Sequence, residues 1–392
     1  MEQPLTAYEY DAINTASAVN LSDGHAYHEL PTALSHIPQE ISTLWSTASS
    51  MTPRDAENRL RSAWALASGS IAMGEVGTWK VCPTASNSLD IIAAWCASRH
   101  MRVAMVEPTF DNLALLFRRR MVTLSPLPLA ADEMIASNNF QDADAIVLVT
   151  PNNPTGRTYS EGELAELAQS CDRAGKTLII DNTFRFYRDN TFDDIQVLEN
   201  SGVEYIVVED SGKTFPTLEM KASPMLYSRT LTDLTDIYEE VYLCTSPVVA
   251  LMISSMLDVV STGDGVDNCI MGLINDRRHR LRDALTNTGL DVALESVESR
   301  LPLEWIDCSR THMHDLEVEQ ILRTRFGLHV LPGRNFWWSS AGKQADGPLS
   351  DGRSDRIRMS LARPANKFEE GIRRLTALAT EGGLAQLGMQ SC

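Results

Sequence analysis

The sequence predicts an α/β fold in which a mostly parallel sheet is flanked by helices. Short apolar runs suited to strands recur at residues 102–106, 145–149, 177–180 and 205–209. Stretches suited to helices, such as residues 160–174, lie between them. This alternation is typical of a parallel sheet. Polar residues also follow three of the runs, which is where open α/β sheets bind their ligands.

The chain length favours a large domain with a smaller one attached. Its 392 residues exceed the usual size of one domain. We expect an N-terminal arm over residues 1–44, a large domain over 45–285 and a smaller α+β domain over 286–392. Helical stretches at 250–260 and 276–285 lead toward the smaller domain. Residues 339–354 are rich in Gly, Ser and Asp, which predicts an exposed loop.

The composition indicates a cytoplasmic enzyme. Lys and Arg number 34 against 52 Asp and Glu, which gives a net charge of −18. Nucleic acid and anionic membranes are therefore poor partners. The start of the chain lacks the features of a signal peptide, and no apolar run reaches membrane-spanning length. The seven cysteines form no CxxC pair, so we expect reduced thiols and no metal.

Three polar residues near the strand ends predict a cofactor site. Asn153 follows the run 145–149, Asp181 follows 177–180, and Lys213 lies in Asp-Ser-Gly-Lys after 205–209. A lysine that forms an imine, a buried aspartate and an asparagine are what a pyridoxal phosphate site requires. Taken singly, Asn153 is also suited to a turn and Asp181 to a helix N-cap.

The order of four motifs resembles the fold-type I aminotransferases of class I and II from about residue 45 to the end. The motifs are Asn-Pro-Thr-Gly at 153–156, Asp181 with an aromatic residue three positions later, Lys213, and Arg-Met-Ser at 358–360. The resemblance implies a homodimer with its active site near the interface. It also implies that Lys213 binds pyridoxal phosphate and then removes the Cα proton of an amino acid. Asp181 would pair with the ring nitrogen, and Asn153 with the phenolic oxygen.

The same resemblance assigns the other cofactor and substrate contacts. Thr84, Ala85 and Ser86 would bind the phosphate at a helix start, although an N-cap role is the competing interpretation. Lys221 stands where relatives carry a phosphate-binding arginine. Phe110 would stack on the ring, unless it only packs in the core. Arg358 would clamp the α-carboxylate, because its planar fork suits that anion.

A narrower resemblance joins the arm to this site. The segments at 5–10, 20–26, 108–112, 150–157 and 209–222 resemble the PLP- and oxygen-dependent L-arginine oxidases and 4-hydroxylases of antibiotic biosynthesis. That branch implies L-arginine and O2 as substrates, a lid helix in the arm and a catalytic His25. The residues implied to contact substrate are Thr6, Glu9, Asp23, Asp210 and Arg358.

Two departures from ordinary aminotransferases support that branch. Phe184 replaces the usual tyrosine, so a hydrogen bond to the phenolic oxygen is lost. Asp210 replaces a phosphate-binding serine, and a carboxylate there suits a cationic substrate group better than a phosphate.

Plainer interpretations stay open for the arm and for the function. Thr6 and Glu9 fit a capping box, Asp23 with Gly24 fits a turn, and His25 could be structural. For the product, 2-ketoarginine and its hydroxylated or desaturated forms all remain possible. A conventional aminotransferase for a cationic amino acid is the main alternative function. An effector domain of a transcription regulator would need a basic DNA-binding module, and the arm before Trp45 is short and acidic.

Overall fold

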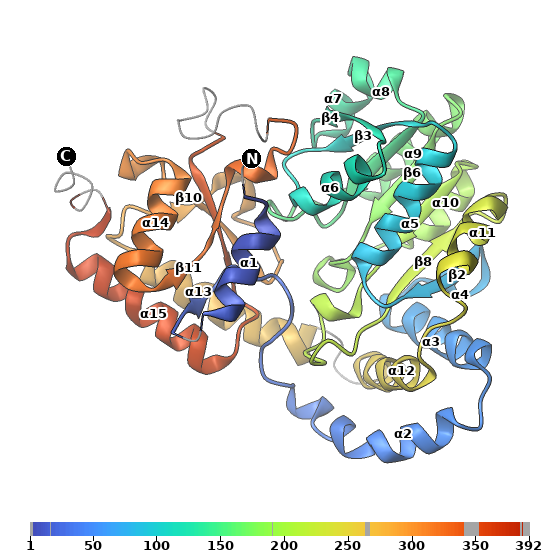
Figure 1. Cartoon of the computed structure of the whole chain (residues 1–392), viewed down its shortest axis with the longest axis horizontal. Helices are drawn as coiled ribbons and strands as arrows, with labels where there is room; N and C mark the ends of the chain where they lie inside the picture. Colours follow the sequence, from blue (N-terminus) through green and yellow to red (C-terminus); the bar gives the residue numbers. More distant parts are fainter. Residues whose placement is uncertain are drawn as a thin grey trace.

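A seven-stranded sheet forms the centre of the larger part of the molecule (Figure 1). The computed structural model describes residues 3–15, 17–189, 191–262, 267–340, 353–384 and 386. The strand order is β2-β8-β7-β6-β5-β3-β4. In chain order the strands are β2 (Thr78–Cys82), β3 (Arg102–Val106), β4 (Thr123–Leu127), β5 (Ala145–Val149), β6 (Thr177–Asp181), β7 (Tyr205–Val208) and β8 (Ser223–Tyr227).

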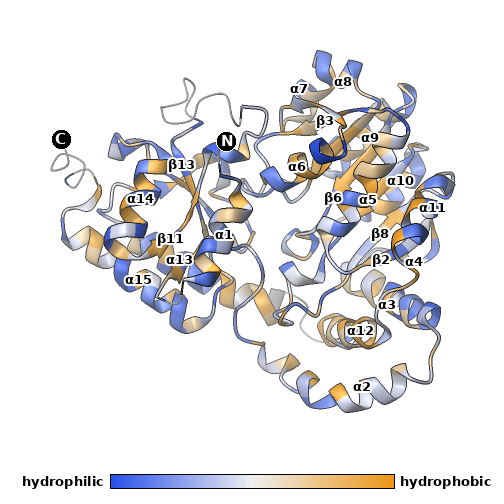
Figure 2. Cartoon of the chain, viewed as in Figure 1, coloured by the Kyte–Doolittle hydropathy of each residue, from blue (hydrophilic) through white to orange (hydrophobic). Residues whose placement is uncertain are grey.

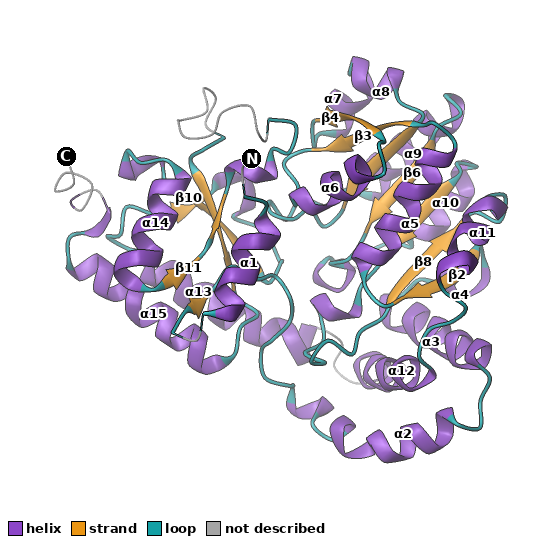
Figure 3. Ribbon diagram, in the orientation of Figure 1, coloured by secondary structure: helices purple, strands orange, loops and turns teal. Residues whose placement is uncertain are grey.

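The sheet is mostly parallel, as the sequence predicts. β4, β3, β5, β6 and β7 run parallel to one another, and β8 runs antiparallel to both β7 and β2. Helices flank it (Figure 3). These are α3 (Pro53–Ser68), α4 (Ile71–Glu75), α5 (Ala85–Ser98), α6 (Asp111–Arg119), α7 (Ala131–Ala136), α8 (Asn138–Asp142), α9 (Glu161–Arg173), α10 (Asp194–Ser201), α11 (Thr232–Val241) and α12 (Pro247–Thr262).

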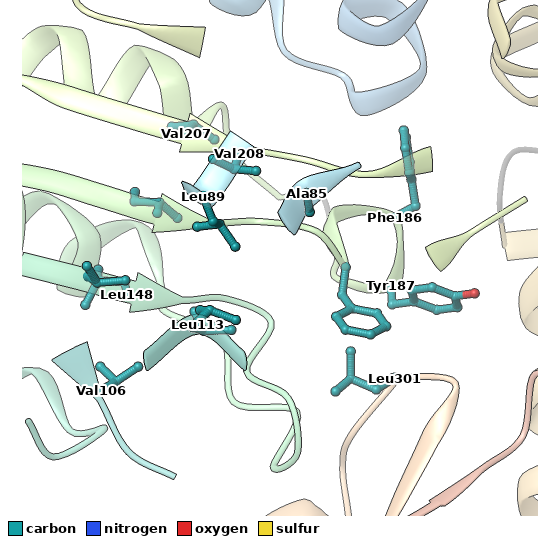
Figure 4. Packing of buried hydrophobic residues seen from close by; sticks show 14 of the residues in the cluster. Ala85, Leu89, Val106, Leu113, Leu148, Phe186, Tyr187, Val207, Val208 and Leu301 are labelled. Carbon is teal, nitrogen blue, oxygen red and sulfur yellow. The ribbon is translucent and has the colours of Figure 1, made fainter. Parts of the chain in front are cut away.

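Continuous apolar strands place the core in this sheet. Every residue of β5, β6 and β7 is buried, as expected for parallel strands covered on both faces. Figure 2 shows the hydrophobic colour along these strands. In Figure 4, Val106, Leu148 and Val207 from three strands lie near Leu89 of α5 and Leu113 of α6. This packing fixes the strand ends that carry the candidate site.

Local capping explains where the neighbouring helices begin. The Thr84 side chain accepts a hydrogen bond from the amide of Asn87, which starts α5. A capping box between Ser160 and Glu163 starts α9. The helix predicted at 160–174 is therefore confirmed.

A smaller sheet and three helices form the second part, on the left of Figure 1. The sheet order is β12 (Leu331–Pro332), β13 (Arg356–Ser360), β10 (Leu303–Asp307) and β9 (Asp291–Val292). The helices are α13 (Gly272–Ala284), α14 (Asp315–Phe326) and α15 (Ala365–Thr380). The predicted domain boundaries stay a prediction. Positions 341–352 of the expected loop at 339–354 lie outside the described residues.

The N-terminal arm joins the two parts. Its strand β1 (Val19–Asn20) pairs in parallel with β11 (Leu328–His329). Its first helix α1 (Leu5–Asn14) contacts both β12 and α6. The arm then continues to α2 (Ile41–Ala48), which packs on α12. Within the described part of the chain, no helix combines the length and the apolar character that crossing a membrane requires.

Candidate active site

A cavity of about 290 Å³ opens at the C-terminal ends of β5, β6 and β7. It brings together most of the residues that the sequence predicts for the cofactor and substrate. Its wall includes Thr6, Glu9, His25, Thr84, Ala85, Ser86, Phe110, Asn153, Asp181, Asp210, Lys213 and Lys221. Asp23 and Arg358 lie behind this wall, so two predicted substrate contacts are not on the cavity surface.

Lys213 lies at the end of a short 3-10 helix, Ser211–Lys213, that follows β7. Its Nζ is 5.9 Å from the ring centre of Phe184, which also lines the cavity. The hydroxyl of buried Tyr187 donates a hydrogen bond to the Lys213 carbonyl at 3.0 Å. This hydrogen bond fixes the backbone of Lys213, and the residue lines the cavity.

Asp181 is the last residue of β6, and its carboxyl group is buried against the cavity. Oδ1 accepts a hydrogen bond from the amide of Thr183 at 3.1 Å. Burial raises the pKa of Asp181 to about 6. A buried carboxylate of this kind fits a protonated ring nitrogen, because that cation would stabilise its charged form.

The start of α5 and the loop before Lys213 meet at Asp210. Its Oδ2 accepts a hydrogen bond from the Ala85 amide at 3.2 Å, and its Oδ1 accepts one from the Gly212 amide at 2.7 Å. Thr84 is the N-cap of α5, so its predicted N-cap role is confirmed, and a phosphate role at the same helix start stays a prediction. The sequence did not indicate that Asp210 binds backbone amides. A substrate contact for Asp210 also stays a prediction.

Lys221 enters the cavity wall beside Gly212. A Cβ atom at Gly212 would meet the Lys221 Cδ at 2.6 Å, so glycine makes room for the lysine stem. The Lys221 Nζ pairs with Glu219 Oε2 at 2.7 Å, and Glu219 also accepts a hydrogen bond from the hydroxyl of Tyr27. Lys221, the cation predicted to bind the phosphate, therefore lines the cavity. Its contact with Glu219 connects it to Tyr27 of the arm.

Arg358 lies on β13 and is 1% exposed, between the cavity and the arm. Nη1 donates to Asn153 Oδ1 at 3.1 Å, which leaves the Asn153 amide group as a donor for a ligand. Nη2 donates to the Ser22 carbonyl at 2.5 Å and to Glu9 Oε1 at 3.1 Å. The guanidinium also lies 5.4 Å from the ring centre of Phe110.

The capping-box interpretation of Thr6 and Glu9 is wrong. Helix α1 begins at Leu5 with Pro4 as its N-cap, and no side chain of the helix caps it. Glu9 instead turns toward Arg358, because that buried guanidinium needs a counter-charge. The first amide of α1, that of Leu5, donates to Asp111 Oδ2 at 3.0 Å across 106 residues. Asp111 lies in the segment 108–112 of the narrower resemblance, but nothing local predicts that it caps a helix so distant in sequence.

His25 lines the cavity, and Asp23 lies behind it. The His25 Nδ1 is 2.7 Å from Asp23 Oδ1, and the His25 amide donates to the same oxygen at 2.9 Å. Arg363 Nη1 lies 3.4 Å from Asp23 Oδ2. The substrate contact expected for Asp23 is therefore not found at the cavity wall, because Asp23 does not line the cavity. The Asp23 carboxyl group instead contacts His25 and Arg363.

A buried ion-pair network supports the cavity floor and was also missed from the sequence. Arg185 donates to both oxygens of Asp194, at 3.0 and 2.8 Å, and its Nε donates to Glu209. Trp64 donates to the other Glu209 oxygen. Arg185 follows Phe184, and Glu209 precedes Asp210, so the network joins the two loops that carry the site. Asp194 lies nine residues from Arg185 and Glu209 lies 24, and no helix or strand periodicity relates these positions, so the sequence does not mark the network.

Comparisons with known proteins agree with this geometry. A family model for class I and II aminotransferases matches residues 55–375. The aromatic aminotransferase ISS1 of Arabidopsis thaliana is 26% identical over 290 residues, which cover 70% of this chain and 69% of that protein.

Solved structures agree as well. The structure of MppP soaked with the product 2-ketoarginine has a TM-score of 0.83 and 28% identity, covering 92% of this chain and 99% of that one. N-succinyldiaminopimelate aminotransferase from Mycobacterium tuberculosis has a TM-score of 0.74 at 19% identity, covering 96% and 97%, and shows the fold.

The chain belongs to the class I and II aminotransferase family. Its fold is the fold-type I architecture predicted from the sequence. It is therefore an enzyme of the PLP-dependent aminotransferase family.

Proposed function

We propose that this enzyme oxidises L-arginine with molecular oxygen and releases a 2-ketoacid and ammonia. The observation that carries the proposal is the likeness to MppP along nearly the whole chain, because 2-ketoarginine is the product of that protein. At 28% identity the likeness extends beyond the fold. The narrower sequence resemblance, which includes the arm, supports the same substrate.

The charges around the cavity support a cationic substrate. Glu9 and Asp210 contribute carboxylates to its wall from opposite sides, one from the arm and one from the loop after β7. Burial raises the pKa of Glu9 despite its contact with Arg358, so a further cation beside Glu9 would stabilise its charged form. A guanidinium supplies two parallel donors for a carboxylate and is desolvated more cheaply than an ammonium.

The residues present fit pyridoxal phosphate. Bound in this cavity, the cofactor supplies an electron sink for the bond that is broken at Cα. Asp181 would hold a proton on the ring nitrogen, and the α5 amides with Lys221 would hold the phosphate. The Lys213 Nζ would take the Cα proton, since the other lysine of the wall, Lys221, is paired with Glu219.

Arg358 would bind the α-carboxylate by exchanging partners. Its Nη2 pairs with Glu9 in this structure. A substrate carboxylate that takes this position leaves Glu9 free to bind the guanidinium at the other end of the substrate. The exchange keeps each buried charge paired, which avoids the cost of an isolated one.

The overall reaction balances in two forms. L-Arginine, O2 and water give 2-ketoarginine, ammonia and hydrogen peroxide. Alternatively, L-arginine and O2 give a hydroxylated 2-ketoarginine and ammonia: O2 accepts four electrons and becomes two waters, and two waters supply the hydroxyl and keto oxygens. In each form O2 is the oxidant, and no keto-acid acceptor is consumed.

Comparing turnover in air and under nitrogen tests the proposal. Ketoacid should form from L-arginine in air and should be absent under nitrogen. Formation at equal rates in both atmospheres would contradict it.

A conventional aminotransferase is the second candidate, because ISS1 is an aminotransferase that matches 70% of the chain. Such an enzyme would convert L-arginine only when a keto-acid is added, and it would not need oxygen. Phe184 argues against it, since the ring there offers no hydroxyl to the phenolic oxygen of the cofactor.

We further propose a homodimer with the active site near the interface. Trp45 on α2 and Leu243 are 65% and 91% exposed, and a partner subunit would cover such apolar side chains. Light scattering after size exclusion tests this: a monomer at working concentrations would contradict it.

A further inference from the structure

His25 is held at the cavity from two sides. Its neighbour Ala26 donates a backbone hydrogen bond to the Gly212 carbonyl at 3.0 Å, next to Lys213. Its ring contacts Asp23, which is 1% exposed, through Nδ1. His25 itself lines the cavity, and its Nδ1 is occupied by the Asp23 contact.

Asp23 is surrounded by groups that stabilise its charge. The His25 amide, the His25 ring and Arg363 all face its carboxyl group, and Arg363 itself is 7% exposed. Although burial opposes ionisation, these contacts hold the pKa of Asp23 below its usual range. An ionised carboxylate can only accept hydrogen bonds, so the proton of this contact is on the His25 Nδ1.

We propose that Asp23 is a positioning residue that fixes His25 in the Nδ1-H tautomer, so that His25 presents Nε2 to the cavity as a proton acceptor. A neutral imidazole has one donor and one acceptor nitrogen. With Nδ1–H committed to Asp23, the acceptor is Nε2. A proton taken at Nε2 gives an imidazolium whose new charge lies beside the Asp23 carboxylate.

This role differs from a guanidinium contact for Asp23. Both assignments use its negative charge, but Asp23 does not line the cavity and already faces Arg363. Removing the Asp23 charge should therefore change what His25 does and should leave arginine binding nearly unchanged. The inference rests on the proposed function for its kinetic part only.

The decisive test is the 15N spectrum of histidine-labelled holoenzyme without substrate, at a pH where the His25 ring is neutral. His25→Gln identifies the His25 signals among the eight histidines. The unaltered enzyme should show protonated Nδ1 and unprotonated Nε2. Asp23→Asn should move most of the population to the Nε2-H form, because the Asn amide can donate to Nδ1. Asp11→Asn, on the same arm but away from the cavity wall, is the matched control and should change nothing.

Kinetics then test whether this tautomer serves the reaction. Asp23→Asn should reproduce most of the change that His25→Ala makes in kcat or in product ratio. The KM for L-arginine should stay within about twofold, and the double variant should be no worse than His25→Ala alone.

Three outcomes would overturn the inference. These are an Nε2-H tautomer in the unaltered enzyme, an unchanged tautomer in Asp23→Asn, or additive effects in the double variant. The spectrum needs no arginine, so its result for Asp23 holds even where the arginine proposal fails.

Discussion

The floor of the cavity and the arm that covers it are held in place by different forces. Asp181 and Lys213 extend from β6 and from the turn after β7, where the sheet ladder fixes the backbone. The arm is attached by a two-residue strand, by single backbone hydrogen bonds such as that from Ala26 to Gly212, and by charged side-chain contacts. Glu9 pairs with Arg358, Asp23 with Arg363, and the Leu5 amide with Asp111.

Because the two regions are held differently, substitutions in each region should affect different steps of the reaction. Floor residues should decide whether the cofactor binds and reacts, because their positions do not depend on any one charge. Arm residues should decide how the substrate is held and what product leaves, because each depends on a charged partner. Substitutions in the two regions should therefore have separable effects.

The largest effect is expected for Lys213→Ala, on the floor. The variant should lose the visible absorbance of lysine-bound cofactor. Its turnover should fall by at least the roughly 10²–10⁴-fold typical of losing a general base. Lys80→Ala, a lysine paired with Glu239 away from the cavity, is the control. A variant that keeps the absorbance would refute the assignment of Lys213.

Asp181→Asn tests the floor through stability. The folded-state pKa of Asp181, about 6, lies above the unfolded value of about 3.9. The cofactor-free protein should therefore lose stability as pH rises from about 4 to 6, with no further loss above that. Since Asn carries no charge, the variant should be more stable above pH 6, by on the order of 2–3 kcal/mol. Urea unfolding at several pH values measures this.

With the cofactor bound, the unaltered protein should be more stable than Asp181→Asn above about pH 6. The ring nitrogen would give the ionised Asp181 a positive partner, so the holoenzyme should favour Asp over Asn. A stability difference that does not depend on pH would show that the Asp181 carboxyl is not desolvated as described.

Asp210→Ser tests whether Asp210, in the loop after β7, contacts the guanidinium of the substrate. If Asp210 contacts the guanidinium, the KM for L-arginine should rise several-fold to about a hundredfold, which corresponds to roughly 1–3 kcal/mol for a charge-assisted bond. L-Lysine should react far more poorly than L-arginine, since it offers a point charge. Asp210→Asn is the matched variant, because it keeps an acceptor for the Gly212 amide but removes the charge. An unchanged KM in both variants would assign Asp210 to the backbone amides alone.

The smallest effect on oxygen consumption is expected for His25→Ala, on the arm. Lys213 removes the Cα proton from the floor, so the variant should still consume oxygen with L-arginine. The proportion of hydroxylated ketoacid should fall, as mass spectrometry of the products can measure. Complete loss of oxygen consumption would show instead that His25 positions the substrate or the arm.

The cofactor residues of the floor could be predicted from the sequence, because Asn153, Asp181 and Lys213 each follow an apolar run. The end of β6 places Asp181, and the runs before Asn153 and Lys213 match β5 and β7. The pattern of apolar runs that predicts the sheet therefore also predicts where these cofactor residues lie.

The arm contacts with the rest of the chain could not be predicted, because they join residues more than a hundred positions apart. The local pattern leaves a capping box and a substrate contact both open for Glu9, whereas its contact with buried Arg358 determines its position. The Asp111 contact with Leu5 and the Arg185 network depend on the folded arrangement in the same way. Charges such as Asp23 were assigned to the substrate because their partners in the chain were not visible in the sequence.

The most direct test of the central claim is an oxygen-electrode trace of the holoenzyme with L-arginine and no keto-acid. The proposed function predicts oxygen uptake that starts with L-arginine, stops when it is exhausted, and is matched by ammonia and a 2-ketoacid. Lys213→Ala should give a flat trace. No uptake by the unaltered enzyme, together with turnover that appears only when a keto-acid is added, would contradict the claim and identify an aminotransferase.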